Sequence, residues 1–235
     1  MLILKLNTFK STFFYSITML TTDLINKTIS FVKEKLANAE GGHDWFHIER
    51  VYKNALLIAK KEVCDTTIVA LGALLHDIAD SKFHGGDETI GPRVAREFLE
   101  TEFVPEEVIA PVIKIIENIS FKGGKTARTF SSIELDIVQD ADRLDAIGAI
   151  GIARAFNYGG FKNRTLHDPK IAPNANMTKE EYKNNNAPTI NHFYEKLLLL
   201  KDKMNTKTGQ EIAQDRHVFM HTFLSQFYAE WDGEK

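Results

Sequence analysis

Residues 68–77 read Ile-Val-Ala-Leu-Gly-Ala-Leu-Leu-His-Asp, an apolar run that ends in a histidine and an aspartate. Asp65, just before the run, has the residue type and position of a helix N-cap, so we expect a buried helix that ends near His76 and Asp77. A charged aspartate tied to the buried end of a helix costs free energy unless a cation compensates it. The end of this helix is therefore the first candidate for a functional site.

Amphipathic helical patterns continue on both sides of this run, and strand-like alternation is absent from the sequence outside its first residues. Pro105 followed by two glutamates is typical of a helix start. Because no repeat or low-complexity linker divides the chain, we predict an all-α fold with a single domain over residues 22–231 and an N-terminal extension over residues 1–21. The expected helices cover about residues 22–40, 46–63, 65–78, 92–103, 105–120, 133–158, 190–204 and 209–231.

The composition excludes several classes of protein. Of the 235 residues, 43% are hydrophobic and 26% are charged, which is typical of a globular protein and excludes wholesale disorder. The 29 basic and 32 acidic residues give a net charge of -3, so we expect neither binding to a nucleic-acid polymer nor binding to a membrane. A single cysteine, Cys64, excludes an intramolecular disulfide and a zinc site built from several thiolates. This composition suits a reducing cytoplasm.

The N-terminal residues contain an apolar and aromatic stretch, Phe13–Leu20. Ser16 and Thr18 interrupt this stretch, and no small-residue cleavage site follows it, so it fits a secretory signal poorly. It is also much shorter than the ~20 apolar residues that span a bilayer. We expect a loosely attached extension, with Met19 as a plausible alternative start.

The dipeptide His-Asp occurs three times, and its context differs each time. The pair at residues 43–44 precedes a predicted helix, where Asp44 is expected to serve as the N-cap. The pair at residues 167–168 lies in a segment rich in Pro and Asn, where we expect it to be solvated. Only the pair at residues 76–77 follows a strongly apolar helix. We therefore rank His76-Asp77 first among the three.

Two other helices carry polar residues on their apolar faces. His47 shares a helical stripe with Val51 and Ile58, so it is expected to point toward the core. On the helix predicted over residues 133–158, three aspartates lie near the apolar face, and periodicity alone does not choose among them: Asp140, Asp142 and Asp145. Imidazole and carboxylate ligands from three buried helices suit Mn²⁺, Mg²⁺, Fe²⁺ or Zn²⁺. Satisfied core histidines and structural ion pairs would give the same pattern.

Three segments together resemble the HD-domain metal-dependent phosphohydrolases. Residues 43–51 read His-Asp-Trp-Phe-His-Ile-Glu-Arg-Val, residues 74–80 read Leu-Leu-His-Asp-Ile-Ala-Asp, and residues 140–148 read Asp-Ala-Asp-Arg-Leu-Asp-Ala-Ile-Gly. The resemblance extends over about residues 22–231 and is strongest to small stand-alone bacterial HD hydrolases, which include nucleotide pyrophosphohydrolases. It implies an α-helical bundle that holds one divalent metal ion. The ligands that it implies are His47, His76, Asp77 and Asp142.

The resemblance also implies a reaction. Mn²⁺ or Mg²⁺ is the expected ion, with Fe²⁺, Ni²⁺ and Zn²⁺ as alternatives. A divalent ion lowers the pKa of a bound water from 15.7 toward ~7 and neutralises phosphoryl oxygens. Asp77 would help to hold the attacking water, and Asp80, one turn beyond His76, is a candidate general base. Alternatively, Asp80 is a helix-end residue paired with Lys82. The expected substrate is a small phosphorylated molecule, most simply a nucleotide.

Lysines near these segments are candidates for binding phosphate groups. Lys82 follows Asp80, and Lys122 and Lys125 flank two glycines whose backbone N–H groups would also be available to an anion. A solvated loop explains these lysines equally well. Only one histidine lies between Asp77 and Asp142, and this favours a single metal ion over a dinuclear centre.

Two other functions remain open from the sequence. One is a non-catalytic HD-fold module that binds a ligand or regulates a partner, and the other is an HD-type metal oxygenase. The pair His217 and His221 has the i,i+4 spacing of a zinc-binding helix but lacks the glutamate that follows the first histidine, so we interpret it as packing. Residues 160–188 exceed the usual length of a structureless connection, and we expect them to form a lid over the pocket.

Overall fold

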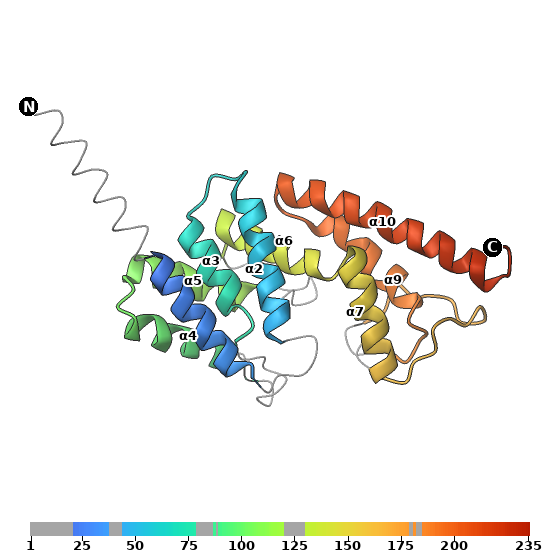
Figure 1. Cartoon of the computed structure of the whole chain (residues 1–235), viewed down its shortest axis with the longest axis horizontal. Helices are drawn as coiled ribbons and strands as arrows, with labels where there is room; N and C mark the ends of the chain where they lie inside the picture. Colours follow the sequence, from blue (N-terminus) through green and yellow to red (C-terminus); the bar gives the residue numbers. More distant parts are fainter. Residues whose placement is uncertain are drawn as a thin grey trace, which may run out of the picture.

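The computed structural model describes residues 21–37, 44–78, 87, 89–119, 130–178, 181 and 185–235. All regular elements in these residues are helical, which confirms the all-α prediction (Figure 1). The first helix covers residues 21–35. It is followed by α2 (Trp45–Ala59), α3 (Thr66–Leu75), α4 (Ile90–Thr101), α5 (Glu106–Asn118), α6 (Ile133–Asp145), α7 (Gly148–Phe161), α9 (Asn191–Glu195), the 3-10 helix η2 (Leu197–Lys203) and α10 (Lys207–Trp231).

Helices α2, α3 and α6 form the centre of the molecule. Helix α2 packs against both α3 and α6, and α3 packs against α5 and α6. Every residue of α3 from Ile68 to Leu75 is buried, as its apolar sequence predicts. Helix α4 packs against α5, and a stacked pair of rings, Phe31 and Phe98, joins the first helix to α4. The candidate histidines, His47 and His76, therefore belong to the helices at the buried centre of the fold.

Side-chain caps set the starts of the helices that carry the candidate site. Asp44 caps α2 by accepting a hydrogen bond from the backbone N–H of His47 at 3.0 Å. Asp65 caps α3 in the same way by accepting from two backbone N–H groups of its first turn, and Ser132 caps α6. These three caps satisfy N–H groups that have no partner inside the helix. The N-cap predictions for Asp44 and Asp65 are confirmed.

The C-terminal part of the chain packs beside this centre. Helix α10 contacts α6, α7 and η2, and in Figure 1 it runs above α7 and α9. Aromatic side chains fill the space between these elements, with the rings of Phe156, Phe193 and Phe223 within 6.1 Å of one another between centroids. None of the helices in the part of the chain that the structure describes is long and apolar enough to cross a membrane.

The prediction of a single helix over residues 133–158 is wrong, because the structure has two helices there. Helix α6 ends at Asp145, and α7 begins at Gly148 and continues to Phe161. Ile147 is extended, and Gly148 has a φ of +75°, a region that favours glycine. A Cβ on Gly148 would also lie 2.9 Å from Cγ of Arg216. The break therefore depends on a glycine against which α10 packs.

The helix predicted over residues 190–204 is also divided. Helix α9 ends at Glu195. Lys196 has a φ of −144° and a ψ of −57°, a backbone conformation that is incompatible with an α-helix. The 3-10 helix η2 follows, and it ends where Met204 adopts an extended backbone conformation. The apolar pattern of this stretch indicates burial correctly, but it does not distinguish an α-helix from a 3-10 helix.

Two expectations for the segment over residues 160–188 are wrong. His167 is half-buried rather than solvated, because its ring contacts those of Phe227, Tyr228 and Trp231 on α10. The described hydrogen bonds of the segment run within itself, to the end of α7 and to residues 189–195, as from Asn174 to Glu195. In Figure 1 the described part of the segment lies beyond α7, near the end of α10, and not over the junction of α2, α3 and α6. Its described part therefore forms no lid over that junction.

Candidate metal centre

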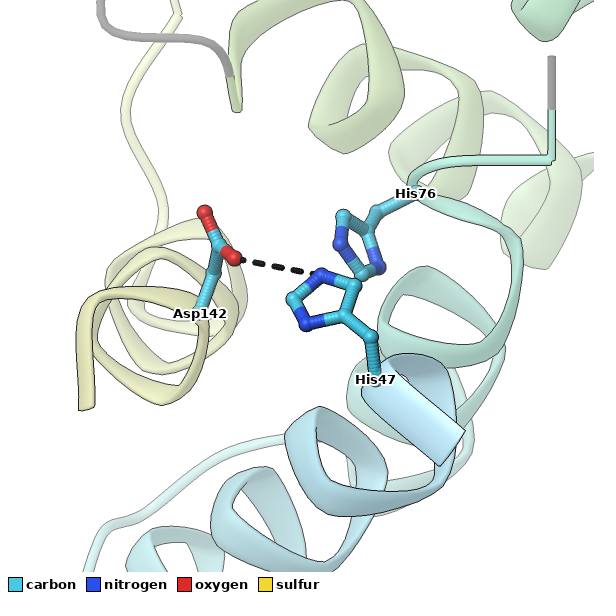
Figure 2. Close-up of side chains that lie close together, drawn as sticks. All are labelled: His47, His76 and Asp142. Atoms are coloured by element: carbon cyan, nitrogen blue, oxygen red, sulfur yellow. Dashed lines mark ion pairs between the residues drawn. The ribbon is translucent and has the colours of Figure 1, made fainter. Parts of the chain in front are cut away.

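Three side chains from three helices converge at one point. One ligand atom each from His47, His76 and Asp142 lies within 4.8 Å of the others. We call these three residues the ligand cluster. Figure 2 shows His47 on α2, His76 at the end of α3 and Asp142 on α6, all directed toward a common space. The sequence separates them by as many as 95 positions, so only the packing of α2, α3 and α6 can bring them together.

His47 lies in the first turn of α2 and is buried, as its position on the apolar stripe predicts. Its Nδ1 is 2.8 Å from Oδ2 of Asp145, and its Nε2 is 3.5 Å from Oδ1 of Asp142. The Asp44 cap fixes the turn from which the His47 side chain projects. The imidazole is therefore held between two carboxylates of α6.

His76 is the C-cap residue of α3 and is buried. Its Nδ1 is 2.8 Å from the carbonyl oxygen of Ala73 in the last turn of the same helix. A carbonyl oxygen can only accept, so Nδ1 carries the proton and donates it. This leaves Nε2 as the atom of His76 that can bind a metal ion. The ring lies 5.4 Å from that of His47, at an interplanar angle of 68°.

Asp142 is the most accessible member of the ligand cluster, with 41% of its side chain exposed. It lies on the face of α6 that is directed toward His47. In contrast to Asp142, both histidines of the cluster are buried. Two buried imidazoles and one partly solvated carboxylate therefore make a site that is open to solvent from the side of Asp142.

The three aspartates near the apolar face of α6 have three different environments. Both carboxylate oxygens of Asp140 accept hydrogen bonds from the start of α10, including the backbone N–H of Thr206 at 2.7 Å. Asp142 belongs to the ligand cluster. Asp145 is buried behind His47 and is bound by Arg50 and Arg154. The structure thus separates the three aspartates that periodicity left equivalent.

The charges around Asp145 determine its ionisation. Burial alone would raise the pKa of this carboxyl group, but hydrogen bonds from His47 and Arg50 and the charge of Arg154 outweigh burial and hold the pKa well below its usual range. Asp145 is therefore a carboxylate at every physiological pH. At Asp140 the balance is opposite, and burial raises the pKa in spite of hydrogen bonds from Thr206 and Asn205.

Comparisons with known proteins agree with this geometry. The model of the HD domain family matches residues 45–147, which include the whole ligand cluster. The protein YpgQ of Bacillus subtilis is 40% identical over 84% of this chain and 88% of its own length. The chain belongs to the HD domain family.

Solved structures of HD relatives share most of the fold. The crystal structure of an HD-superfamily hydrolase from Bacillus thuringiensis is 43% identical, has a TM-score of 0.74, and is matched over 90% of this chain and 98% of its own. The crystal structure of Bacillus subtilis YpgQ in complex with ADP is 35% identical, with a TM-score of 0.71, over 90% of this chain and 96% of that chain. The likeness therefore extends well beyond the matched HD domain into the C-terminal helices.

The donor set of this HD domain fits a divalent metal ion. It offers two imidazole nitrogens and a carboxylate oxygen, which suit Mn²⁺, Fe²⁺, Ni²⁺ or Zn²⁺. The separation of 3.5 Å between Nε2 of His47 and Oδ1 of Asp142 is close to that of two adjacent ligands, each ~2.0–2.2 Å from one ion. The site can therefore hold a metal ion without a change of fold.

The other residues singled out from the sequence have separate outcomes. Asp77 is half-buried and directly follows His76, but it is not among the three side chains of the ligand cluster, so its roles as ligand and catalytic residue stay predictions. Four predicted catalytic or phosphate-binding residues lie outside the described residues: Asp80, Lys82, Lys122 and Lys125.

The sequence reasoning missed the two arginines that bind Asp145. Arg50 lies one turn after His47 on α2, so its spacing from His47 places both on one face of that helix. Arg154 lies on α7, beyond the helix break, and no helical periodicity relates it to Asp145. The first arginine could have been found from the sequence, but the second required the structure.

Proposed function

We propose that this HD-domain protein is a divalent-metal-dependent phosphohydrolase whose substrate is a small phosphorylated molecule, most simply a nucleotide. The observation that carries the proposal is the convergence of two imidazoles and one carboxylate in the ligand cluster. The ADP in the crystal structure of the relative YpgQ supports a nucleotide as the ligand. The manganese or magnesium ion expected from the sequence is part of this proposal.

The residues of the ligand cluster would hold the ion. His47 and His76 would each bind through Nε2, because Nδ1 of each is occupied by an acceptor, Asp145 and the Ala73 carbonyl respectively. Asp142 would supply an oxygen, and Asp77 would join as a further ligand. When bound, a divalent ion lowers the pKa of water and neutralises phosphoryl oxygens, which favours attack of water on phosphorus.

The chain itself would orient the substrate and the water. The open side of the site is that of Asp142, so the phosphate group would approach the ligand cluster from there. Asp77 would position the attacking water, and Asp80 would accept its proton. Lys82, Lys122 and Lys125 would neutralise the remaining phosphate charge.

A screen of nucleoside mono-, di- and triphosphates with Mn²⁺, Mg²⁺, Ni²⁺, Fe²⁺ and Zn²⁺ tests this function by phosphate and pyrophosphate release. We expect metal-dependent release by the native protein. His76→Ala and Asp142→Ala should lower turnover by about 10³-fold or more, because each loses several kcal/mol of transition-state stabilisation. His221→Ala, a histidine variant outside the ligand cluster, should be unaffected.

Other outcomes point to the alternative functions. Tight nucleotide binding without phosphate or pyrophosphate release would indicate a ligand-binding HD module. Metal-dependent oxygen uptake, with two ions per chain, would indicate an oxygenase. Full turnover in the His76→Ala variant would place the chemistry outside the ligand cluster and contradict the proposal.

A further inference from the structure

Asp145 lies on the side of His47 that is opposite to the ligand cluster. Its side chain is 1% exposed, and its Oδ2 is 2.8 Å from Nδ1 of His47. The other nitrogen of the same ring, Nε2, is 3.5 Å from Asp142. The imidazole is therefore clamped between a buried carboxylate and the ligand cluster.

The direction of the hydrogen bond between His47 and Asp145 fixes the tautomer of the histidine. Both oxygens of Asp145 are surrounded by donors, so the group is an ionised carboxylate that can only accept. Nδ1 of His47 lies 2.8 Å from Oδ2 of Asp145 and 3.3 Å from a terminal nitrogen of Arg154. The shorter contact is with an acceptor, and an Nδ1 without a proton would turn its lone pair against that of the carboxylate, so Nδ1 carries the proton and Nε2 is the nitrogen that can bind an ion. This arrangement of carboxylate, histidine and metal is a general way to orient a ligand and raise its basicity.

Two arginines on different helices hold Asp145 in place. Arg50, on α2, donates from Nε to Oδ1 at 2.5 Å and from a terminal nitrogen to Oδ2 at 3.0 Å. Arg154, on α7, donates to Oδ2 and to the backbone carbonyl of Asp145. With contacts from α2 and α7, the carboxylate on α6 cannot rotate without breaking several charge-assisted hydrogen bonds.

We propose that Asp145 is a positioning residue, whose carboxylate sets the tautomer and ring orientation of His47 and thereby the affinity of the ligand cluster for its metal ion. Arg50, from α2, and Arg154, from α7, hold that carboxylate in place by donating hydrogen bonds to it. The inference rests on the proposed function only in requiring that the ligand cluster binds a divalent ion.

A purely structural ion pair between Asp145 and the arginines would leave metal affinity unchanged apart from its effect on folding. The matched control is therefore Asp140→Asn. Asp140 is also a buried aspartate of α6 whose oxygens accept from N–H donors, but those donors belong to Asn205, Thr206 and Arg143 and not to His47. Both substitutions turn an amide NH₂ group toward donors and should lower the stability of the fold.

The first measurement is a titration of the full chain with Mn²⁺, in which electron paramagnetic resonance reports the free ion. We expect Asp145→Asn to raise the Kd for Mn²⁺ by ~10–100-fold, and Asp140→Asn to change it by less than about threefold. Equal affinities in two folded variants would overturn the role of Asp145. A native protein that binds no divalent ion would instead contradict the proposed function.

The second measurement needs no variant of Asp145 and so does not depend on its folding. Long-range ¹H–¹⁵N spectra of the native protein labelled at histidine distinguish the two imidazole nitrogens, and His47→Gln assigns the signal. We expect the proton of His47 on Nδ1, both without metal and with diamagnetic Zn²⁺. A proton on Nε2 alone would overturn the inference even if Asp145→Asn fails to fold.

Discussion

His192, in the first turn of α9, is a half-buried histidine near positive charge. Burial, together with the charges of Lys196 and Arg164, lowers its pKa from 6.5 to about 4. Between these two values the unfolded chain takes up a proton that the folded chain excludes. The free energy of unfolding therefore falls as the pH decreases from 6.5 toward 4, with a maximum contribution of about 3 kcal/mol.

We predict that His192→Gln reduces this acid sensitivity. Between pH 7 and pH 5, the native protein should lose about 2 kcal/mol more unfolding free energy than the variant. Urea unfolding at the two pH values measures the difference, and His221→Gln, which removes an exposed histidine, is the control. An equal loss in the native protein and in both variants would mean that His192 is not the group responsible.

Single residues also show how far the sequence could predict the site. The stripe of His47 and the apolar run before His76 place both histidines correctly, because burial follows from local periodicity. The aspartates of α6 differ, because their roles depend on partners such as Thr206 and Arg154, which no local pattern connects to α6. The resemblance to HD phosphohydrolases selected Asp142, which the structure places in the ligand cluster.

At the scale of elements, the break between α6 and α7 positions Arg154 against Asp145. The sequence of residues 133–158 keeps a helical pattern throughout, so the break could not be predicted from hydrophobicity. It depends on the positive φ of Gly148 and on the packing of Arg216, whose side chain donates to the carbonyl oxygen of Leu144 at the end of α6. Tertiary packing thus overrides a local preference for one continuous helix.

We predict that Gly148→Ala destabilises the fold by about 2–3 kcal/mol, from the cost of a side chain at positive φ and the displacement of Arg216. Gly160→Ala, in the last turn of the same helix, is the matched control. A Cβ there meets nothing within 4 Å, so this variant should be neutral or up to about 1 kcal/mol more stable. Thermal unfolding of both variants tests the prediction. The prediction is wrong if Gly148→Ala has the same melting temperature as the native protein.

At the scale of the whole molecule, Asp140 links the centre of the fold to the C-terminal helices. It accepts hydrogen bonds from the backbone N–H groups of Asn205 and Thr206 and from the hydroxyl of Thr206 at 2.9 Å. These contacts fix the start of α10. The expectation of a lid was wrong because it concerned the arrangement of the whole molecule. The composition of residues 160–188 predicts a loop, but it does not predict that the loop packs against α10.

We predict that Asp140→Ala costs about 2–4 kcal/mol of unfolding free energy, because it leaves two backbone N–H groups of the α10 start without an acceptor. Thr206→Ser, which keeps the hydroxyl that bonds Asp140, is the control and should cost much less. Urea unfolding measures both variants. A cost below about 1 kcal/mol for Asp140→Ala would indicate that water replaces the carboxylate at little expense.

Metal binding should stabilise the whole molecule, because the ligand cluster joins α2, α3 and α6. An ion that binds only the folded chain adds RT ln(1 + [M]/Kd), about 2.7 kcal/mol at a concentration 100 times the Kd. For a chain of this length we expect the melting temperature to rise by about 5–10 °C. His76→Ala should abolish this rise, because it removes a buried nitrogen ligand that no neighbouring group of the cluster replaces.

The i,i+4 pair on α10 supplies the control for this experiment. Nε2 of His217 and Nε2 of His221 are 3.1 Å apart, so a weakly held ion at this pair could also stabilise the fold. His221→Ala should therefore keep the full rise in melting temperature if the ligand cluster is the site. If the rise persists in His76→Ala but disappears in His221→Ala, the stabilising ion binds to α10, and the two histidines at the centre of the fold are core residues rather than ligands.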